Sequence, residues 1–133
     1  MQRILLAYDG TDGARKALDT AATFATTFGA TVTVVSVVPV HAGRAPMDPW
    51  DDRTVHAEEL REAAVLLHER GVSFDLSEPV GDVPRTIERM AADGGYDLIV
   101  VGSRNLGSVG RLLQGSVSEH VAGHAATTVV VAR

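Results

Sequence analysis

Residues 102–118, GSRNLGSVGRLLQGSVS, hold four glycines and only two charged residues, both Arg. The segment follows the apolar run at residues 98–101, whose length and β-branching predict a buried strand. It leads into a predicted helix with Ser116 as the N-cap residue and Glu119 closing a capping box. Such a connection can bind phosphate, because glycine backbone N–H groups and a helix N-terminus both attract an anion. A glycine-rich surface loop is the alternative that these residues alone leave open.

Strands and helices alternate on both sides of this segment. Apolar or alternating runs predict strands at residues 4–8, 31–38, 72–76, 97–101 and 127–132. Helical spacing predicts helices at residues 11–28, 54–70, 82–92 and 116–123, with Thr11 and Asp82 as caps. Gly29 and Gly71 follow the first two helices. The stretch from Pro39 to Arg53 contains three of the five prolines and predicts a long loop.

This alternation predicts an α/β fold, a doubly wound parallel sheet with helices on both faces. Because crossovers in such sheets are right-handed, every loop that leads from a strand into a helix lies at one edge. Ligands bind at that edge, where the strand order reverses. Asp9 and Gly10, the turn after Val38 and the glycine-rich segment all lie there, and this strengthens the prediction of a phosphate site.

Composition narrows the classes of protein to consider. A chain of 133 residues with 45% hydrophobic residues fits a single domain over residues 1–133. It has no Cys and no apolar run near the ~20 residues that span a bilayer, so we expect a cytoplasmic protein without a signal peptide. Its 17 acidic residues against 12 basic ones argue against nucleic-acid binding, and we expect no membrane partner.

The sequence does not contain the residue spacings of other common nucleotide-binding, hydrolase or metal-binding motifs. The only lysine, Lys16, lies inside a predicted helix, so there is no Walker loop, and neither a dinucleotide fingerprint nor a G-x-S-x-G elbow occurs. His120 and His124 share a helix face but lack a third metal ligand, which favours packing or a charge at the helix C-terminus. We expect His41, His56 and His68 to face solvent.

Several short stretches resemble the universal stress protein family over essentially the whole chain. They are GSR at residues 102–104, LLQGSVS at 112–118, ILLAYDGT at 4–11, Gly81-Asp82 and TVVV at 128–131. The family's nucleotide-binding members carry G-x2-G-x9-G-[S/T]. That pattern falls here on Gly102, Asn105, Gly115 and Ser116 with both spacings intact. Asn105 replaces the second glycine, and we expect it to weaken nucleotide binding without abolishing it, so that Asn105→Gly tightens it.

The resemblance implies a five-stranded parallel sheet in the order 3-2-1-4-5, with ATP (or AMP or ADP) and Mg²⁺ as ligands. Asp9 would lie near the ribose and the metal, and Val37 beside adenine. Arg104 and Arg111 either add positive charge near the phosphates or stay solvated. The nucleotide-binding residues that it implies are Asp9, Val37, Gly102, Arg104, Asn105, Gly115, Ser116, Val117 and Ser118.

The predicted function is nucleotide-dependent regulation of a stress response, without catalytic residues. A slow ATP hydrolase or phosphotransferase is one alternative, although no Lys and no evident base occupy the loops. A dimeric scaffold with an empty site is the other. We also expect a homodimer through the strand from Thr127 to Ala132, because its apolar edge would otherwise face water.

Overall fold

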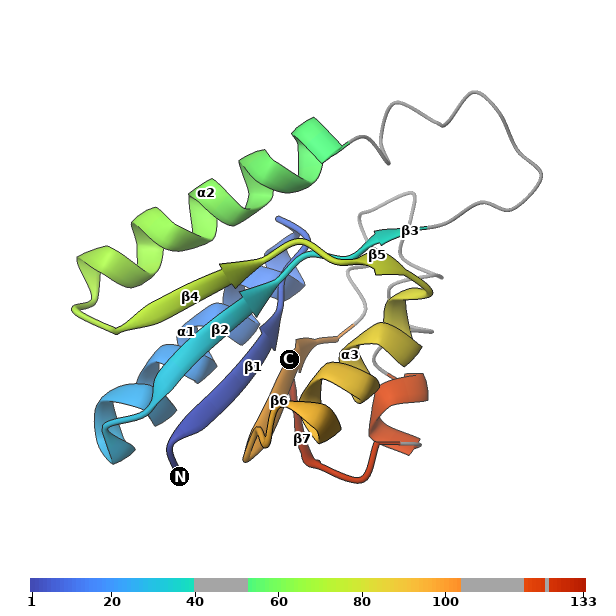
Figure 1. The fold of residues 1–133 in the computed structure, drawn as a ribbon. Helices are drawn as coiled ribbons and strands as arrows, with labels where there is room; N and C mark the ends of the chain where they lie inside the picture. The colour runs from blue at the N-terminus through green and yellow to red at the C-terminus, as the bar shows by residue number, and fades with distance from the viewer. Residues whose placement is uncertain (40–52, 104–118, 124) are drawn as a thin grey trace.

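The computed structural model describes residues 1–39, 53–103, 119–123 and 125–133. Its centre is a five-stranded parallel sheet in the order β4-β2-β1-β6-β7 (Figure 1). When only the five strands of this sheet are numbered in chain order, their order is 3-2-1-4-5. This is the predicted order, and the predicted fold class is confirmed. The bounds of these strands are Arg3–Ala7 for β1, Thr31–Val35 for β2, Phe74–Ser77 for β4, Leu98–Gly102 for β6 and Thr128–Ala132 for β7.

Helices cover both faces of the sheet (Figure 1). Side chains of α1 (Asp12–Phe28) and α2 (Arg53–Glu69) pack with Ile4 and Leu6 of β1 in one apolar core. The other face buries Leu5 against α3 (Val83–Asp93) and against Val121, which lies in the helical residues 119–123. Because side chains alternate along a strand, β1 contributes side chains to both cores and is buried on both faces. Among the described residues no helix is both long and apolar enough to cross a bilayer.

The predicted helix ends are confirmed at both described caps. The Thr11 side chain accepts a hydrogen bond from the Ala14 backbone N–H at the start of α1. Asp82 does the same for Arg85 at the start of α3. Gly29 ends α1 in the left-handed region, with a φ of 68°, which a side chain would strain. The predicted cap Ser116 lies outside the described residues.

The predicted strand over residues 31–38 is divided in two. Val38–Pro39 forms a separate short strand, β3, which pairs in parallel with β5 (Val80–Gly81) as a second small sheet. Proline lacks a backbone N–H, so Pro79 cannot donate to the strand beside it and interrupts the hydrogen-bond ladder between β2 and β4, although Ser36 and Val38 still donate to Ser77 and Pro79. Ser36 and Val37 therefore lie at a bend beyond the carboxyl end of the main sheet.

Candidate nucleotide-binding edge of the sheet

The carboxyl ends of β1 and β6 are neighbours, as the predicted site requires. The connection after β1 leads into α1, whose first turn packs directly on the end of β6. A Cβ placed on Gly102 would lie 2.5 Å from the carbonyl carbon and oxygen of Gly13. A Cβ on Gly13 would lie 2.7 Å from the Ser103 carbonyl oxygen. Since neither backbone has room for a side chain, the two glycines bring the start of α1 against the start of the glycine-rich segment.

This contact adds a reason for glycine at position 102. In a phosphate-binding loop, glycine leaves room for the anion close to the backbone. In the described residues a side chain at position 102 would collide with the backbone of α1, so Gly102 is needed for helix–strand packing whether or not a ligand binds.

Asp9 is exposed and shapes the turn between β1 and α1. Its Oδ1 atom accepts hydrogen bonds from the Thr11 backbone N–H at 3.1 Å and from the Thr11 hydroxyl at 2.6 Å. Gly10 follows with a φ of +77°. Asp9 therefore has the turn-forming role that its sequence position suggests, and its carboxylate also lies at the sheet edge where ligands bind in this class of fold.

Val37 lies at the same edge but is buried, with 7% of its surface exposed. Its side chain packs with Leu5, Ile99 and Val101 in the core on the α3 side. A contact between Val37 and adenine would therefore use its backbone more than its side chain. The remaining predicted binding residues lie outside the described residues, and their roles stay predictions; they are Arg104, Asn105, Gly115, Ser116, Val117 and Ser118.

A buried histidine, His56, lies near this edge and was not predicted from the sequence. We expected His56 to face solvent, and this is wrong: it is 9% exposed, and its Nδ1 atom lies 2.7 Å from the Ser36 hydroxyl oxygen. The same nitrogen lies 3.1 Å from Glu59 Oε1. The helical spacing contained a signal, because His56 continues the stripe of Leu60, Ala63 and Leu67, which are buried. His68, at the other end of α2, is exposed as expected.

The electrostatics of this edge are dominated by carboxylates. Burial raises the pKa of Glu59 to about 7, and the charges of Asp9 and Glu62 add to the shift. Glu62 has the opposite environment: hydrogen bonds from Arg15 and from Tyr8 lower its pKa. Burial and the same contact with Glu62 raise the pKa of Tyr8. A cation held near Asp9 and Glu59 would relieve the repulsion between them.

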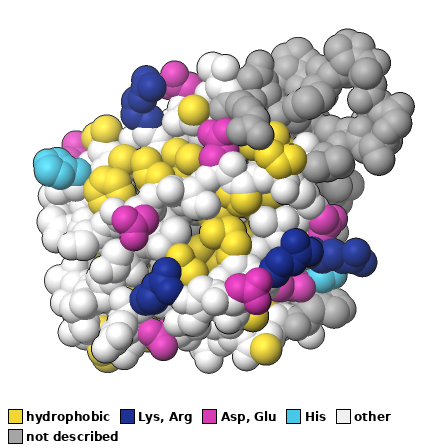
Figure 2. Space-filling model, in the orientation of Figure 1, with side chains coloured by type: hydrophobic (Ala, Val, Ile, Leu, Met, Phe, Trp, Pro, Cys, Tyr) yellow, Lys and Arg dark blue, Asp and Glu magenta, His cyan; other side chains and the backbone are white. Residues whose placement is uncertain are grey.

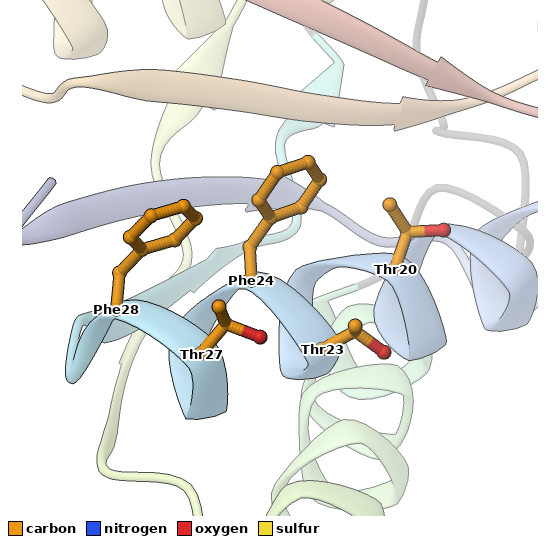
Figure 3. A pocket seen from close by; sticks show the side chains of 5 residues that line it. All are labelled: Thr20, Thr23, Phe24, Thr27 and Phe28. Atoms are coloured by element: carbon orange, nitrogen blue, oxygen red, sulfur yellow. The ribbon is translucent and has the colours of Figure 1, made fainter.

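Two further features of the described residues are a histidine contact and a shallow cavity. His120 Nδ1 is 2.7 Å from Glu88 Oε2, so this histidine links α3 to residues 119–123; His124 lies outside the described residues. A shallow cavity of about 270 Å³ is lined by Thr20, Thr23, Phe24, Thr27 and Phe28 (Figure 3). All five come from the second half of α1, whereas Gly13 lies in its first turn and Asp9 lies in the turn before the helix.

A family model and a sequence relative both match this chain to the same protein family. The model of the family described as "Universal stress protein family" matches residues 1–133. A Thermus aquaticus protein named "Universal stress protein in QAH/OAS sulfhydrylase 3′ region" is 36% identical over 135 residues, covering 98% of this chain and 97% of its own.

Solved structures agree on the fold. A universal stress protein from Archaeoglobus fulgidus in complex with dAMP is 24% identical, with a TM-score of 0.79 over 100% of this chain and 98% of its own. A universal stress protein in complex with cAMP is 23% identical, with a TM-score of 0.78 over 99% and 97%.

Proposed function

The chain belongs to the universal stress protein family, and from this premise we propose that it is an ATP-binding regulatory protein whose output depends on nucleotide occupancy. The proposed site lies at the carboxyl edge of the sheet. Asp9 and Val37 would face the nucleoside, and the segment that starts at Gly102 would hold the phosphates.

The observation that carries the proposal is the contact between Gly13 and the end of β6. It brings the first turn of α1, the Asp9 turn and the start of the glycine-rich segment together at neighbouring strands. The sheet order reverses at this point, since β1 connects through α1 to β2 on one side and pairs with β6 on the other. Doubly wound folds bind nucleotides at such a point.

Relatives of known structure support the choice of ligand. Proteins of the same fold have been solved with cAMP and with dAMP, both of which contain adenine. Their identity to this chain is low, so the argument rests on the shared fold and on the G-x2-G-x9-G-[S/T] spacing at Gly102, Asn105, Gly115 and Ser116.

The donor chemistry fits a magnesium ion brought in by the nucleotide. Mg²⁺ is usually held by one or two carboxylates together with phosphate oxygens and water. Asp9 supplies an exposed carboxylate at the sheet edge. Within residues 1–39, 53–103, 119–123 and 125–133 no three His, Cys, Asp or Glu side chains could hold a metal by themselves. When bound, Mg²⁺ would offset the negative charge of the phosphates.

The proposal is tested by the nucleotide content of the purified protein and by phosphate release. We expect ATP or another adenine nucleotide to copurify or to bind after removal, with phosphate release no faster than a slow background. Steady phosphate release that depends on the protein would support the hydrolase instead. Protein that neither carries nor binds an adenine nucleotide would contradict the proposal and favour the scaffold.

A further inference from the structure

Two buried polar side chains and one largely buried carboxyl group lie between the end of β2 and the first turns of α2. We call Ser36, His56 and Glu59 the α2 polar cluster. Ser36 is 2% exposed, and the Glu59 side chain is 15% exposed. His56 Nδ1 is at the centre, 2.7 Å from the Ser36 hydroxyl oxygen and 3.1 Å from Glu59 Oε1. His56 Nδ1 is therefore hydrogen-bonded to the residue that follows β2 and lies close to, without hydrogen-bonding, the carboxyl group one turn further along α2.

The cluster is not fully satisfied. Among the buried side-chain nitrogen and oxygen atoms that the structure describes, His56 Nε2 and Glu59 Oε1 lack a hydrogen-bond partner. A buried polar group without a hydrogen-bond partner destabilises the folded state. Apolar residues, such as Leu60 and Leu67 on the same face of α2, would pack here at no such cost. Buried polar groups that lack hydrogen-bond partners are found mainly at functional positions of proteins.

The cluster touches both strand ends that border the proposed site. Ser36 directly precedes Val37, and the two side chains point to opposite sides of the sheet, Ser36 toward α2 and Val37 into the core with α3. On the other side, Glu59 Cγ lies 3.5 Å from the position a Cβ on Gly10 would occupy. Gly10 directly follows Asp9. The cluster therefore lies between Val37, the expected adenine contact, and Asp9, the expected contact for the ribose and the metal.

We propose that the α2 polar cluster is a positioning device for the nucleoside half of the site, holding the strand end at Val37 in register with the turn at Asp9 and Gly10. This inference rests on the proposed function. Ser36, His56 and Glu59 are positioning residues, because they act through Val37 and Asp9. The glycine-rich segment, which would bind the phosphates, starts from a different strand, and its affinity for phosphate alone does not depend on the cluster.

Calorimetric titration with ATP, adenosine and inorganic triphosphate separates positioning from general stability. His56→Leu removes a polar ring and Glu59→Gln removes an ionisable carboxyl group, and both keep the side-chain volume close to the original. We expect both variants to bind adenosine and ATP about tenfold more weakly, the loss of one polar contact, and to bind triphosphate as the wild type does. His56→Asn, whose amide can replace Nδ1 beside Ser36, restores most of the adenosine affinity.

Matched controls lie on the same helix. His68→Leu and Glu58→Gln make the same chemical changes at exposed positions, and we expect no change for any of the three ligands. Adenosine affinity unchanged in both cluster variants would overturn the inference, as would a parallel loss of adenosine and triphosphate binding. Wild-type protein that binds neither ATP nor adenosine would instead refute the proposed function, and the inference with it.

Discussion

Glu59 shows how a single buried carboxyl connects stability to pH. In the folded protein its pKa is raised from 4.5 to about 7 by burial and by the charges of Asp9 and Glu62. Between those two values the folded state keeps a proton that the unfolded state has lost, so this group's contribution to stability falls as pH rises. Each pKa unit corresponds to about 1.4 kcal/mol, which gives a loss on the order of 3 kcal/mol across the window.

Glu59→Gln should remove this dependence. In protein free of nucleotide and divalent cations, wild type and variant are compared by urea denaturation at a series of pH values. We expect the wild type to lose stability relative to the variant from about pH 4.5 to about pH 7 and to keep a constant difference below that range. Glu58→Gln, at a position whose side chain is 63% exposed, is the control. A constant difference across the whole range would show that Glu59 titrates normally.

Gly102 links two elements, and its replacement tests how they pack. Gly102→Ala would place a methyl group 2.5 Å from backbone atoms of Gly13, where no flexible side chain can yield. Overpacking of this kind costs about 1–3 kcal/mol. Urea denaturation should show that loss in protein without ligand. The control is Gly123→Ala, since a Cβ on Gly123 meets nothing within 4 Å. Equal stability of the two variants would contradict the close packing of α1 on β6.

The elements also show how far the sequence predicts this structure. Strand identity, sheet order and the caps at Thr11 and Asp82 follow from local patterns, because periodicity and capping residues act over a few positions. The break at Ser36 between β2 and β3 was not predicted. An apolar run does not show where a strand stops pairing in one sheet and begins to pair in a second one. His56 was missed for a different reason. Its polarity outweighed its place on the helical stripe, whereas burial is decided by the stripe and by a partner 20 residues away.

At the scale of the whole molecule, the two outer strands of the main sheet, β4 and β7, differ in chemistry. Figure 2 shows hydrophobic side chains between interspersed acidic and basic ones on one face, and Leu76 of the β4 edge is 45% exposed. That edge also carries Asp75, which is exposed and opposes pairing with a second copy. β7, with the sequence TVVVA, has no charged residue, and among the strands that the structure describes it pairs with β6 alone. We therefore retain the proposal of a homodimer through β7.

Val130→Lys tests this proposal by light scattering. We expect about twice the chain mass of 14.0 kDa for the wild type and monomer or insoluble protein for the variant, because Val130 of the edge strand packs against the apolar core and a charge there disrupts that packing. Leu76→Lys makes the same change of charge at the other edge and should leave the dimer intact. A wild-type mass of one chain at micromolar concentration would refute pairing through β7.

The most direct test of ATP binding at this edge is thermal and urea unfolding of wild-type protein and Gly115→Val, with and without ATP and Mg²⁺. Ligand at about 100 times its dissociation constant should stabilise the wild type by about 2.7 kcal/mol. Valine at position 115 would block the approach of phosphate to the predicted helix N-terminus. We therefore expect the variant to fold without ligand and to gain nothing from it. An equal ATP-dependent gain in both proteins would contradict the account.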